Sequence, residues 1–199
     1  MKILGIDERL NRIKDVIIND PFFGGKSLSS GTGGYIFDYD PEDELVVREF
    51  VKNFKDRKDL GFDVQEFDLF EIMIGYLQEQ GYLETAFELE EECRNEKEGI
   101  GYMIRAMADL FQADSQNDIF IDYIQKHAVK GNVLFITGVG KCHPFIRSHK
   151  ILNNFDSKLN GVKTVLFYPG DYNSDELKLF GTIPSENYYR SMKLVERSE

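Results

Sequence analysis

Two apolar segments in the last third of the sequence constrain the fold more than any other feature. They are Val133–Ile136 and Val162–Tyr168. Strands that are apolar on both sides belong to sheets that helices cover on both faces. Segments with strand-like and helix-like spacing alternate along the chain, which favours right-handed crossovers and parallel strands. The sequence therefore predicts a three-layer αβα domain with a mostly parallel sheet, Rossmann-like or P-loop-like without a working Walker A motif.

The other elements follow from apolar periodicity and from helix-start and turn residues. Further strands are expected at Tyr35–Phe37, Phe62–Phe67 and Leu177–Phe180. Helices are expected over 7–18, after Asp40-Pro41, from Leu69, from Leu83, over about 100–112 and 117–129, and from His143-Pro144 to about Asn154; a last short element begins at Asn187. A chain of 199 residues buries enough surface for one core. We expect one domain over 1–199, with a helical lobe over about 69–129.

Charge is distributed unevenly along the chain, whose net charge is −11. Residues 63–98 hold twelve acidic and two basic side chains, so the expected lobe is an acidic insertion. Affinity for nucleic acid grows with cationic contacts to phosphates, so no direct nucleic-acid partner is expected. The run ELEEECRNEKE is either a solvated helix face or a docking face for a basic partner.

The sequence also indicates where the protein resides. No apolar run approaches the roughly 18 residues that a membrane span needs, so no membrane partner is expected. The N-terminal segment MKILGIDERLNRIKD carries charges where a signal peptide would be apolar. Cys93 and Cys142 lie far apart and form no CxxC motif. We therefore expect a cytoplasmic protein in a reducing compartment.

Two glycine-containing segments invite comparison with phosphate-binding loops. Gly25-Lys26-Ser27 resembles the end of a P-loop, but position 20 holds Asp20 where the motif needs glycine. The segment 137–141, Thr-Gly-Val-Gly-Lys, follows a strand and could offer N–H groups to an anion. Its simpler interpretation is a tight turn that needs glycine for its backbone angles. A degenerate nucleotide or phosphate binder is one alternative function.

Carboxylates at strand ends suggest a second alternative. Asp38 and Asp40 end one expected strand, and Glu66 and Asp68 end the next. Carboxylates at adjacent strand ends could hold Mg²⁺ for a metal-dependent nuclease or phosphoesterase, although Asp40 also fits a helix cap. Zinc is not expected at Cys142, His143 and His149, because the two histidines would lie about 240° apart around one helix. No cofactor is expected.

Three segments of the C-terminal third resemble the BrxB family, a small component of bacterial BREX phage-defence systems. They are LFITGVGKCHPFIRSHKILNNF (134–155), TVLFYPGDYNSDELKLFG (164–181) and ENYYRSMKL (186–194). The shared features are an apolar strand followed by TGVG, then a PF-RSH-LNN-like block, a strand ending in PG, and a closing NYYR. The first 130 residues match this family in length and in the style of their helices.

The resemblance implies an intracellular defence protein with no established catalytic activity. Other parts of such systems include a large ATPase, an alkaline-phosphatase-like protein (PglZ) and a methyltransferase. The expected function is that of a non-enzymatic assembly subunit that bridges components such as the phosphatase-like protein and the ATPase. One expected partner surface is acidic, over 63–98, and the other comprises Gly138, Gly140, Pro144, Arg147, His149, Tyr188, Tyr189 and Arg190.

Overall fold

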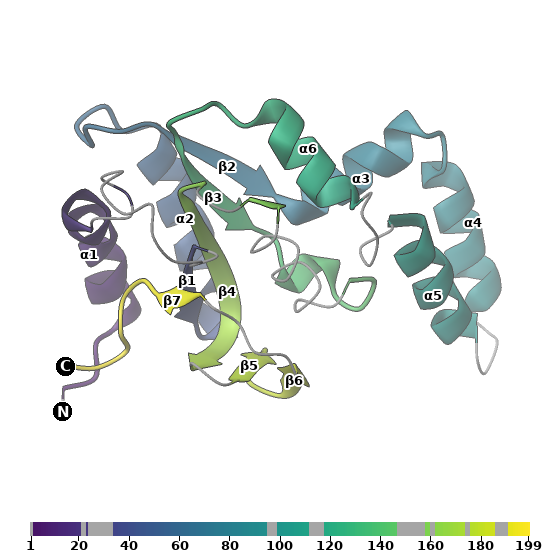
Figure 1. Cartoon of the computed structure of the whole chain (residues 1–199). Helices are drawn as coiled ribbons and strands as arrows, with labels where there is room; N and C mark the ends of the chain where they lie inside the picture. Colours follow the sequence, from purple (N-terminus) through teal and green to yellow (C-terminus); the bar gives the residue numbers. More distant parts are fainter. Residues whose placement is uncertain are drawn as a thin grey trace.

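The computed structural model describes residues 2–20, 23, 34–94, 99–111, 118–146, 158–159, 162–173, 176–185 and 191–199. The helices are α1 (Ile6–Asn19), α2 (Glu44–Lys55), α3 (Leu69–Glu79), α4 (Leu83–Cys93), α5 (Gly99–Phe111) and α6 (Ile119–His127). The strands are β1 (Tyr35–Tyr39), β2 (Val64–Asp68), β3 (Val133–Thr137), β4 (Thr164–Asn173), β5 (Glu176–Leu179), β6 (Ile183–Ser185) and β7 (Met192–Lys193). Figure 1 shows the strands in the middle of the molecule and the helices arranged around them.

The central part of the sheet is parallel. Its strands lie in the order β2-β3-β4-β1-β7, and each neighbouring pair runs in the same direction. β5 and β6 extend β4 as an antiparallel meander. The mostly parallel sheet that the apolar segments predict is therefore confirmed.

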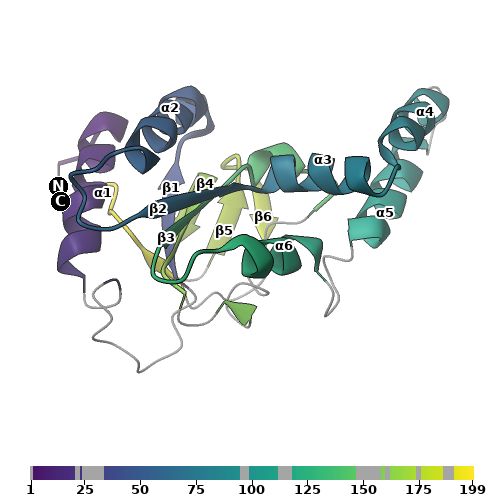
Figure 2. The same cartoon turned by 90° about the horizontal axis from the view of Figure 1, so that it is seen from above.

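Alternate side chains of the central strands face opposite layers of helices. On one face, α1 and α2 cover an apolar cluster whose strand residues are Tyr35, Phe37, Tyr39, Val133, Phe135, Val165 and Phe167. On the other, α3, α5 and α6 contribute to a cluster that includes Ile36, Leu134, Ile136, Leu166 and Tyr168. The odd and even positions separate because strand side chains alternate in direction. The three-layer αβα architecture is confirmed, and Figure 2 shows the layers from above.

Two helices that shape the candidate site begin at aspartates. The Asp68 carboxylate accepts hydrogen bonds from the N–H groups of Phe70 and Glu71, at 2.9 and 3.3 Å, at the start of α3. Asp118 does the same at the start of α6, at 2.8 and 3.2 Å. Such caps satisfy backbone donors that have no partner within the helix. The two caps therefore fix the residues at which α3 and α6 begin.

The helices α4 and α5 pair with each other beyond the end of α3. Figures 1 and 2 show this pair away from the sheet, whereas α6 lies over the sheet. The described residues of the pair that are buried are Cys93, Gly99, Met107 and Phe111. Exposed side chains thus outnumber buried ones among the described residues of the pair. The division of the chain into one domain with a lobe over about 69–129 stays a prediction.

Two local predictions are wrong. The helix expected to open at His143-Pro144 does not begin there, because residues 143–146 form turns after a single 3-10 turn at Gly140–Cys142. His143 has extended backbone angles, as a residue before proline favours. The strand expected to reach Phe180 ends at Leu179, since Phe180 has a φ of 55°. The rest of the helix expected to reach Asn154, and the element expected at Asn187, lie outside the described residues.

No helix among the described residues is both long enough and apolar enough to cross a membrane.

Candidate functional site

The four carboxylates expected to gather at adjacent strand ends do not form one cluster. β3 and β4 lie between β1 and β2. Three strand spacings separate the end that carries Asp38 from the end that carries Glu66 and Asp68, about 14 Å in all. The strand order therefore does not support the alternative of a shared Mg²⁺ site at adjacent strand ends. Among the described residues, no group of three or more His, Cys, Asp or Glu side chains is placed to hold a metal ion.

The two acids of β2 are each paired with a lysine. Glu66 accepts from Lys55 Nζ at 2.6 Å and from Thr137 Oγ1 at 3.0 Å. Asp68 pairs with Lys141, whose ammonium also lies 5.3 Å from the centre of the Phe70 ring. These contacts join β2 to α2 and to the turn after β3. Both carboxylates thus have structural partners.

Asp38 lies in a buried charge cluster at the end of β1. Its side chain is 1% exposed, and its oxygens lie 2.8 Å from Arg9 Nη2, 3.1 Å from Lys193 Nζ and 3.0 Å from Arg197 Nε. Burial by itself raises the pKa of Asp38, but the three cations outweigh it and hold the pKa below its ordinary value. Asp40 pairs with Arg197 at 2.6 Å. The Asp38 cluster therefore contains a stable carboxylate anion.

The Asp38 cluster joins the N-terminal helix to the C-terminal segment. Arg9 also donates to the carbonyl oxygens of Asp38, at 2.6 Å, and Val195, at 2.9 Å. Arg197 Nη2 donates to the carbonyl oxygen of Gly170 in β4 at 2.8 Å. Sequence reasoning missed Arg9, although it stands three residues after Ile6 and so on the apolar face of α1. The contacts give this cluster a structural role.

The glycines of the segment 137–141 are explained by packing. Gly138 has a φ of 80°, and a Cβ there would overlap the Asp68 carboxylate. A Cβ on Gly140 would come within 2.9 Å of both Pro169 and Phe180. Asp68 fills the space beside Gly138, and Lys141, the cation of this segment, is already paired with it, so the arrangement favours the interpretation as a tight turn over an anion site.

Cys142 does not resemble a nucleophile. Its side chain is fully buried, and burial, with the nearby Asp68 carboxylate, raises the pKa of its thiol to about 12. A thiol with this pKa is almost wholly protonated near neutral pH, whereas the thiolate is the reactive form. The second cysteine, Cys93, is also buried. Neither environment favours cysteine chemistry.

The structure places three of the expected interface residues. Gly138 and Gly140 are partly buried in the turn after β3, and Pro144 is exposed shortly after them. The other five lie outside the described residues: Arg147, His149, Tyr188, Tyr189 and Arg190. This surface therefore stays a prediction.

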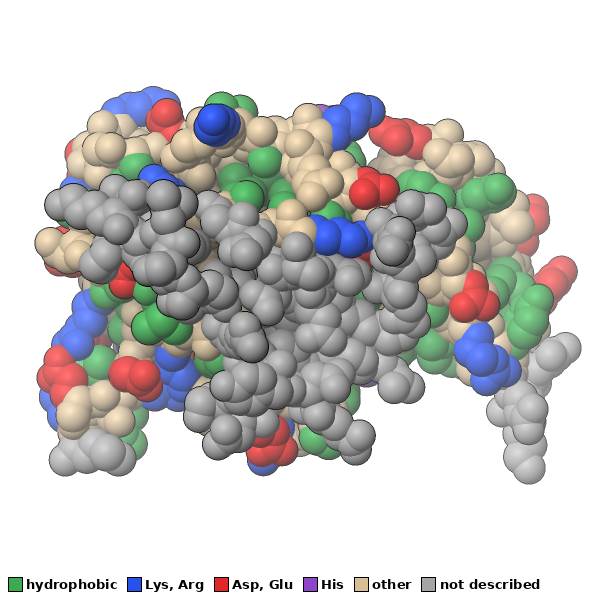
Figure 3. Space-filling model, viewed as in Figure 1, with side chains coloured by type: hydrophobic (Ala, Val, Ile, Leu, Met, Phe, Trp, Pro, Cys, Tyr) green, Lys and Arg blue, Asp and Glu red, His purple; other side chains and the backbone are tan. Residues whose placement is uncertain are grey.

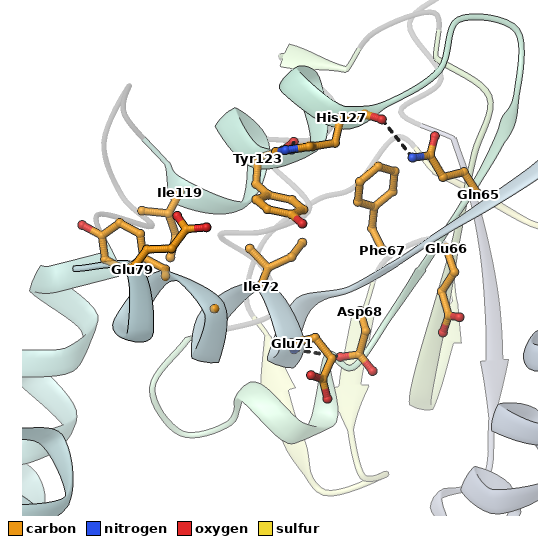
Figure 4. A pocket seen from close by; sticks show the side chains of 12 residues that line it. Gln65, Glu66, Phe67, Asp68, Glu71, Ile72, Glu79, Ile119, Tyr123 and His127 are labelled. Carbon is orange, nitrogen blue, oxygen red and sulfur yellow. Dashed lines mark hydrogen bonds between the residues drawn. The ribbon is translucent and has the colours of Figure 1, made fainter. Parts of the chain in front are cut away.

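A groove that sequence reasoning did not anticipate lies along β2, α3 and α6. Its cavity has a volume of about 670 Å³. Phe67 and Ile72 form its apolar floor, and Tyr123 of α6 faces them (Figure 4). The lining also includes Gln65, Glu66, Asp68, Glu71, Gly75, Tyr76, Glu79, Ile119 and His127. The lining residues come from segments that are far apart in the sequence, so no local sequence pattern predicts this groove.

The α4–α5 pair presents a second unusual surface. Large side chains are exposed on or next to it: Tyr82 (45%), Phe87 (56%), Ile100 (45%) and Tyr102 (57%). The exposed acids Glu84 and Glu91 stand three residues before and four residues after Phe87, on the same face of α4. Figure 3 shows apolar and acidic side chains together over the end of the molecule that holds these helices. Exposed apolar groups bordered by charge mark sites of protein association.

Comparison with known proteins decides the family. The family model described as BREX protein BrxB matches residues 65–194. A BREX protein BrxB from Bacillus cereus (strain H3081.97) is 39% identical over 96% of this chain and 98% of its own length. The chain belongs to the BrxB family. A second BREX protein BrxB, from Escherichia coli O9:H4 (strain HS), is 26% identical over 96% of this chain and 92% of its own length.

Membership of the BrxB family confirms the resemblance found in the sequence and supports a role in BREX defence. It also suggests that other BREX proteins are partners of this chain. No solved structure matches the chain. The fold and the surfaces described above therefore come from this chain's own structure.

Proposed function

We propose that this BrxB-family chain is a non-enzymatic assembly subunit of a BREX complex. It bridges other components, such as the alkaline-phosphatase-like protein and the large ATPase. The α4–α5 surface binds one partner, and the surface around Gly138, Gly140 and Pro144 contacts another. The chain contributes contacts between proteins, and the chemistry of defence belongs to those partners.

The exposed surface of the α4–α5 pair carries this proposal. Phe87 and Tyr102 are each more than half exposed, so both keep apolar area in contact with water. Burial of such area gives roughly 25 cal/mol per Å², and aromatic side chains are frequent anchors of interfaces. The surrounding glutamates favour a partner with a basic surface, because complementary charge speeds association and selects the partner.

The arrangement of the charged groups supports a role without catalysis. Asp38, Glu66 and Asp68, the candidates for metal chemistry, each pair with lysine or arginine. The Cys142 thiol is buried and has a raised pKa. The three carboxylates considered for metal chemistry thus hold strands, turns and helices together.

Replacing Phe87 and Tyr102 together with serine is expected to reduce recovery of a BREX partner in affinity purification at least tenfold. The loss follows if both side chains are anchors of the interface, because the few residues that carry most of the binding energy each cost more than about 1 kcal/mol when truncated. Thermal unfolding should stay within a few degrees of the original, because both side chains are mostly exposed.

The matched control is the pair Ile18→Ser and Leu45→Ser, which are exposed on α1 and α2. Recovery of the partner should not change in this control. Full recovery with the Phe87→Ser and Tyr102→Ser double variant would remove the α4–α5 surface from the proposal.

A further inference from the structure

Among the described strands, β2 pairs with β3 alone, so its other edge presents unpaired backbone groups. The carbonyl oxygen of Asp63 accepts from the N–H of Val133 at 2.9 Å. Since the backbone groups of alternate residues point to alternate sides of a strand, Gln65 also faces β3, and Val64 and Glu66 face outward. No described residue hydrogen-bonds to these outward groups. Such an edge is a template for another strand.

The groove along β2, α3 and α6 lies against this same edge. Figure 4 shows it between α6 on one side and the line of β2 and α3 on the other. Phe67 and Ile72 are 4% and 7% exposed and belong to the core cluster, so the floor is apolar and well packed. Phe67 is held edge-on against Tyr123, with ring centres 6.3 Å apart. The groove therefore combines backbone pairing groups with an apolar floor on which a side chain can pack.

The α3 side of the groove is acidic. Glu66 and Asp68 are neutralised by Lys55 and Lys141. Glu71 and Glu79 line the groove along α3, are exposed, and have no ion pair within the described residues. The α3 side of the groove thus attracts positive charge at both of its ends.

We propose that the groove receives an extended, basic segment of a partner protein, which adds to β2 as a further strand. This inference deepens the proposed assembly function and rests on it. An apolar side chain of the segment packs on Phe67 and Ile72, and lysine or arginine side chains reach Glu71 and Glu79. Strand addition of this kind takes affinity from backbone pairing and specificity from alternate side chains.

The spacing of the two glutamates gives the proposal a recognisable sequence pattern. Glu71 and Glu79 are eight residues apart on α3, a rise of about 12 Å. An extended chain covers about 12 Å in three to four residues. The bound segment should therefore carry basic residues three or four positions apart, after an apolar one.

Photo-crosslinking from inside the groove tests the proposal. Gly75 lines the groove, and a Cβ on it would meet no atom within 4 Å, so p-benzoylphenylalanine is introduced at this position. The full chain is expressed with its BREX partners, irradiated, and digested for mass spectrometry. We expect crosslinks from Gly75 to one contiguous segment of a BREX protein with the basic pattern, and none to that segment from exposed Lys52 on α2.

A synthetic peptide of the crosslinked segment then tests the mode of binding to the purified chain. Alternate N-methylation, which removes the pairing N–H groups, should weaken binding at least tenfold. The double variant Glu71→Lys and Glu79→Lys should weaken it to a similar degree. The control Glu42→Lys and Glu49→Lys makes the same change of charge on and beside α2 and should leave the affinity unchanged.

Three results would overturn the inference: no crosslink from Gly75 while the partner is still recovered, a crosslink to a small molecule, or full affinity of the N-methylated peptide. The first result leaves the assembly function standing and removes the groove. Failure to recover any BREX partner with the original chain would instead remove the assembly function, so the two failures are distinguishable.

Discussion

Replacing Asp38 with alanine is expected to lower the free energy of unfolding by about 3–5 kcal/mol. The substitution leaves Arg9 buried, at 4% exposure, without its anionic partner. Breaking a buried ion pair by removing one member typically costs this much, because the remaining charge is uncompensated. Arg197 and Lys193 lose the same partner, which loosens the C-terminal segment. Urea unfolding monitored by circular dichroism measures the effect.

The control for this prediction is Asp40→Ala. Asp40 pairs with the same Arg197, but its side chain is 66% exposed, and exposed pairs contribute about 1 kcal/mol or less. The account of the Asp38 cluster is wrong if the two variants unfold at the same urea concentration.

The Asp38 cluster also predicts how stability depends on pH. The pKa of Asp38 is lowered in the folded protein, so the unfolded chain binds its proton more readily. The contribution to stability is then present above the unfolded value, about 3.9, and is lost as the pH falls through the lowered pKa. The difference in stability between the original chain and Asp38→Ala should therefore shrink below about pH 4. A constant difference down to pH 2 would contradict this linkage.

Gly170→Ala should destabilise the fold by about 2–4 kcal/mol. Gly170 has a φ of 153°, and a Cβ there would overlap the carbonyl oxygen of Lys178 and come within 2.9 Å of the Phe180 nitrogen. Both atoms belong to the backbone, so the clash is relieved only by moving β5 away from β4. Backbone strain and overpacking each cost about 1–3 kcal/mol. Urea unfolding again provides the measurement.

Gly75→Ala is the matched control. It lies inside α3, with open space around the added methyl group, and alanine favours a helix over glycine by up to about 1 kcal/mol. This control should be neutral or slightly stabilising. Similar losses in both variants would show that the packing between Gly170 and Lys178 has no special role.

The layers of the fold could be predicted because they depend on local patterns. The apolar spacing of Val133–Ile136 and the segment after Val162 required a sheet covered on both faces, and β3 and β4 lie in its centre. The break at His143 could also have been expected from the proline after it. Periodicity carries information about burial, and burial is what separates the layers.

The candidate site could not be predicted because it depends on strand order. Asp38 and Asp68 end consecutive strands in the sequence, yet β3 and β4 pair between those strands. The groove joins Phe67 of β2 to Tyr123 of α6, residues that approach each other only after the sheet has formed. The resemblance of the C-terminal segments predicted the BrxB family, but no residue pattern in the sequence indicated this groove.

Affinity purification of the tagged full chain from cells that carry its neighbouring BREX genes, followed by mass spectrometry, tests the assembly function most directly. The proposal predicts stoichiometric recovery of the alkaline-phosphatase-like protein or the large ATPase, with the yield lost in the Phe87→Ser and Tyr102→Ser double variant. Recovery of the chain alone, under conditions in which both proteins are expressed, would contradict it.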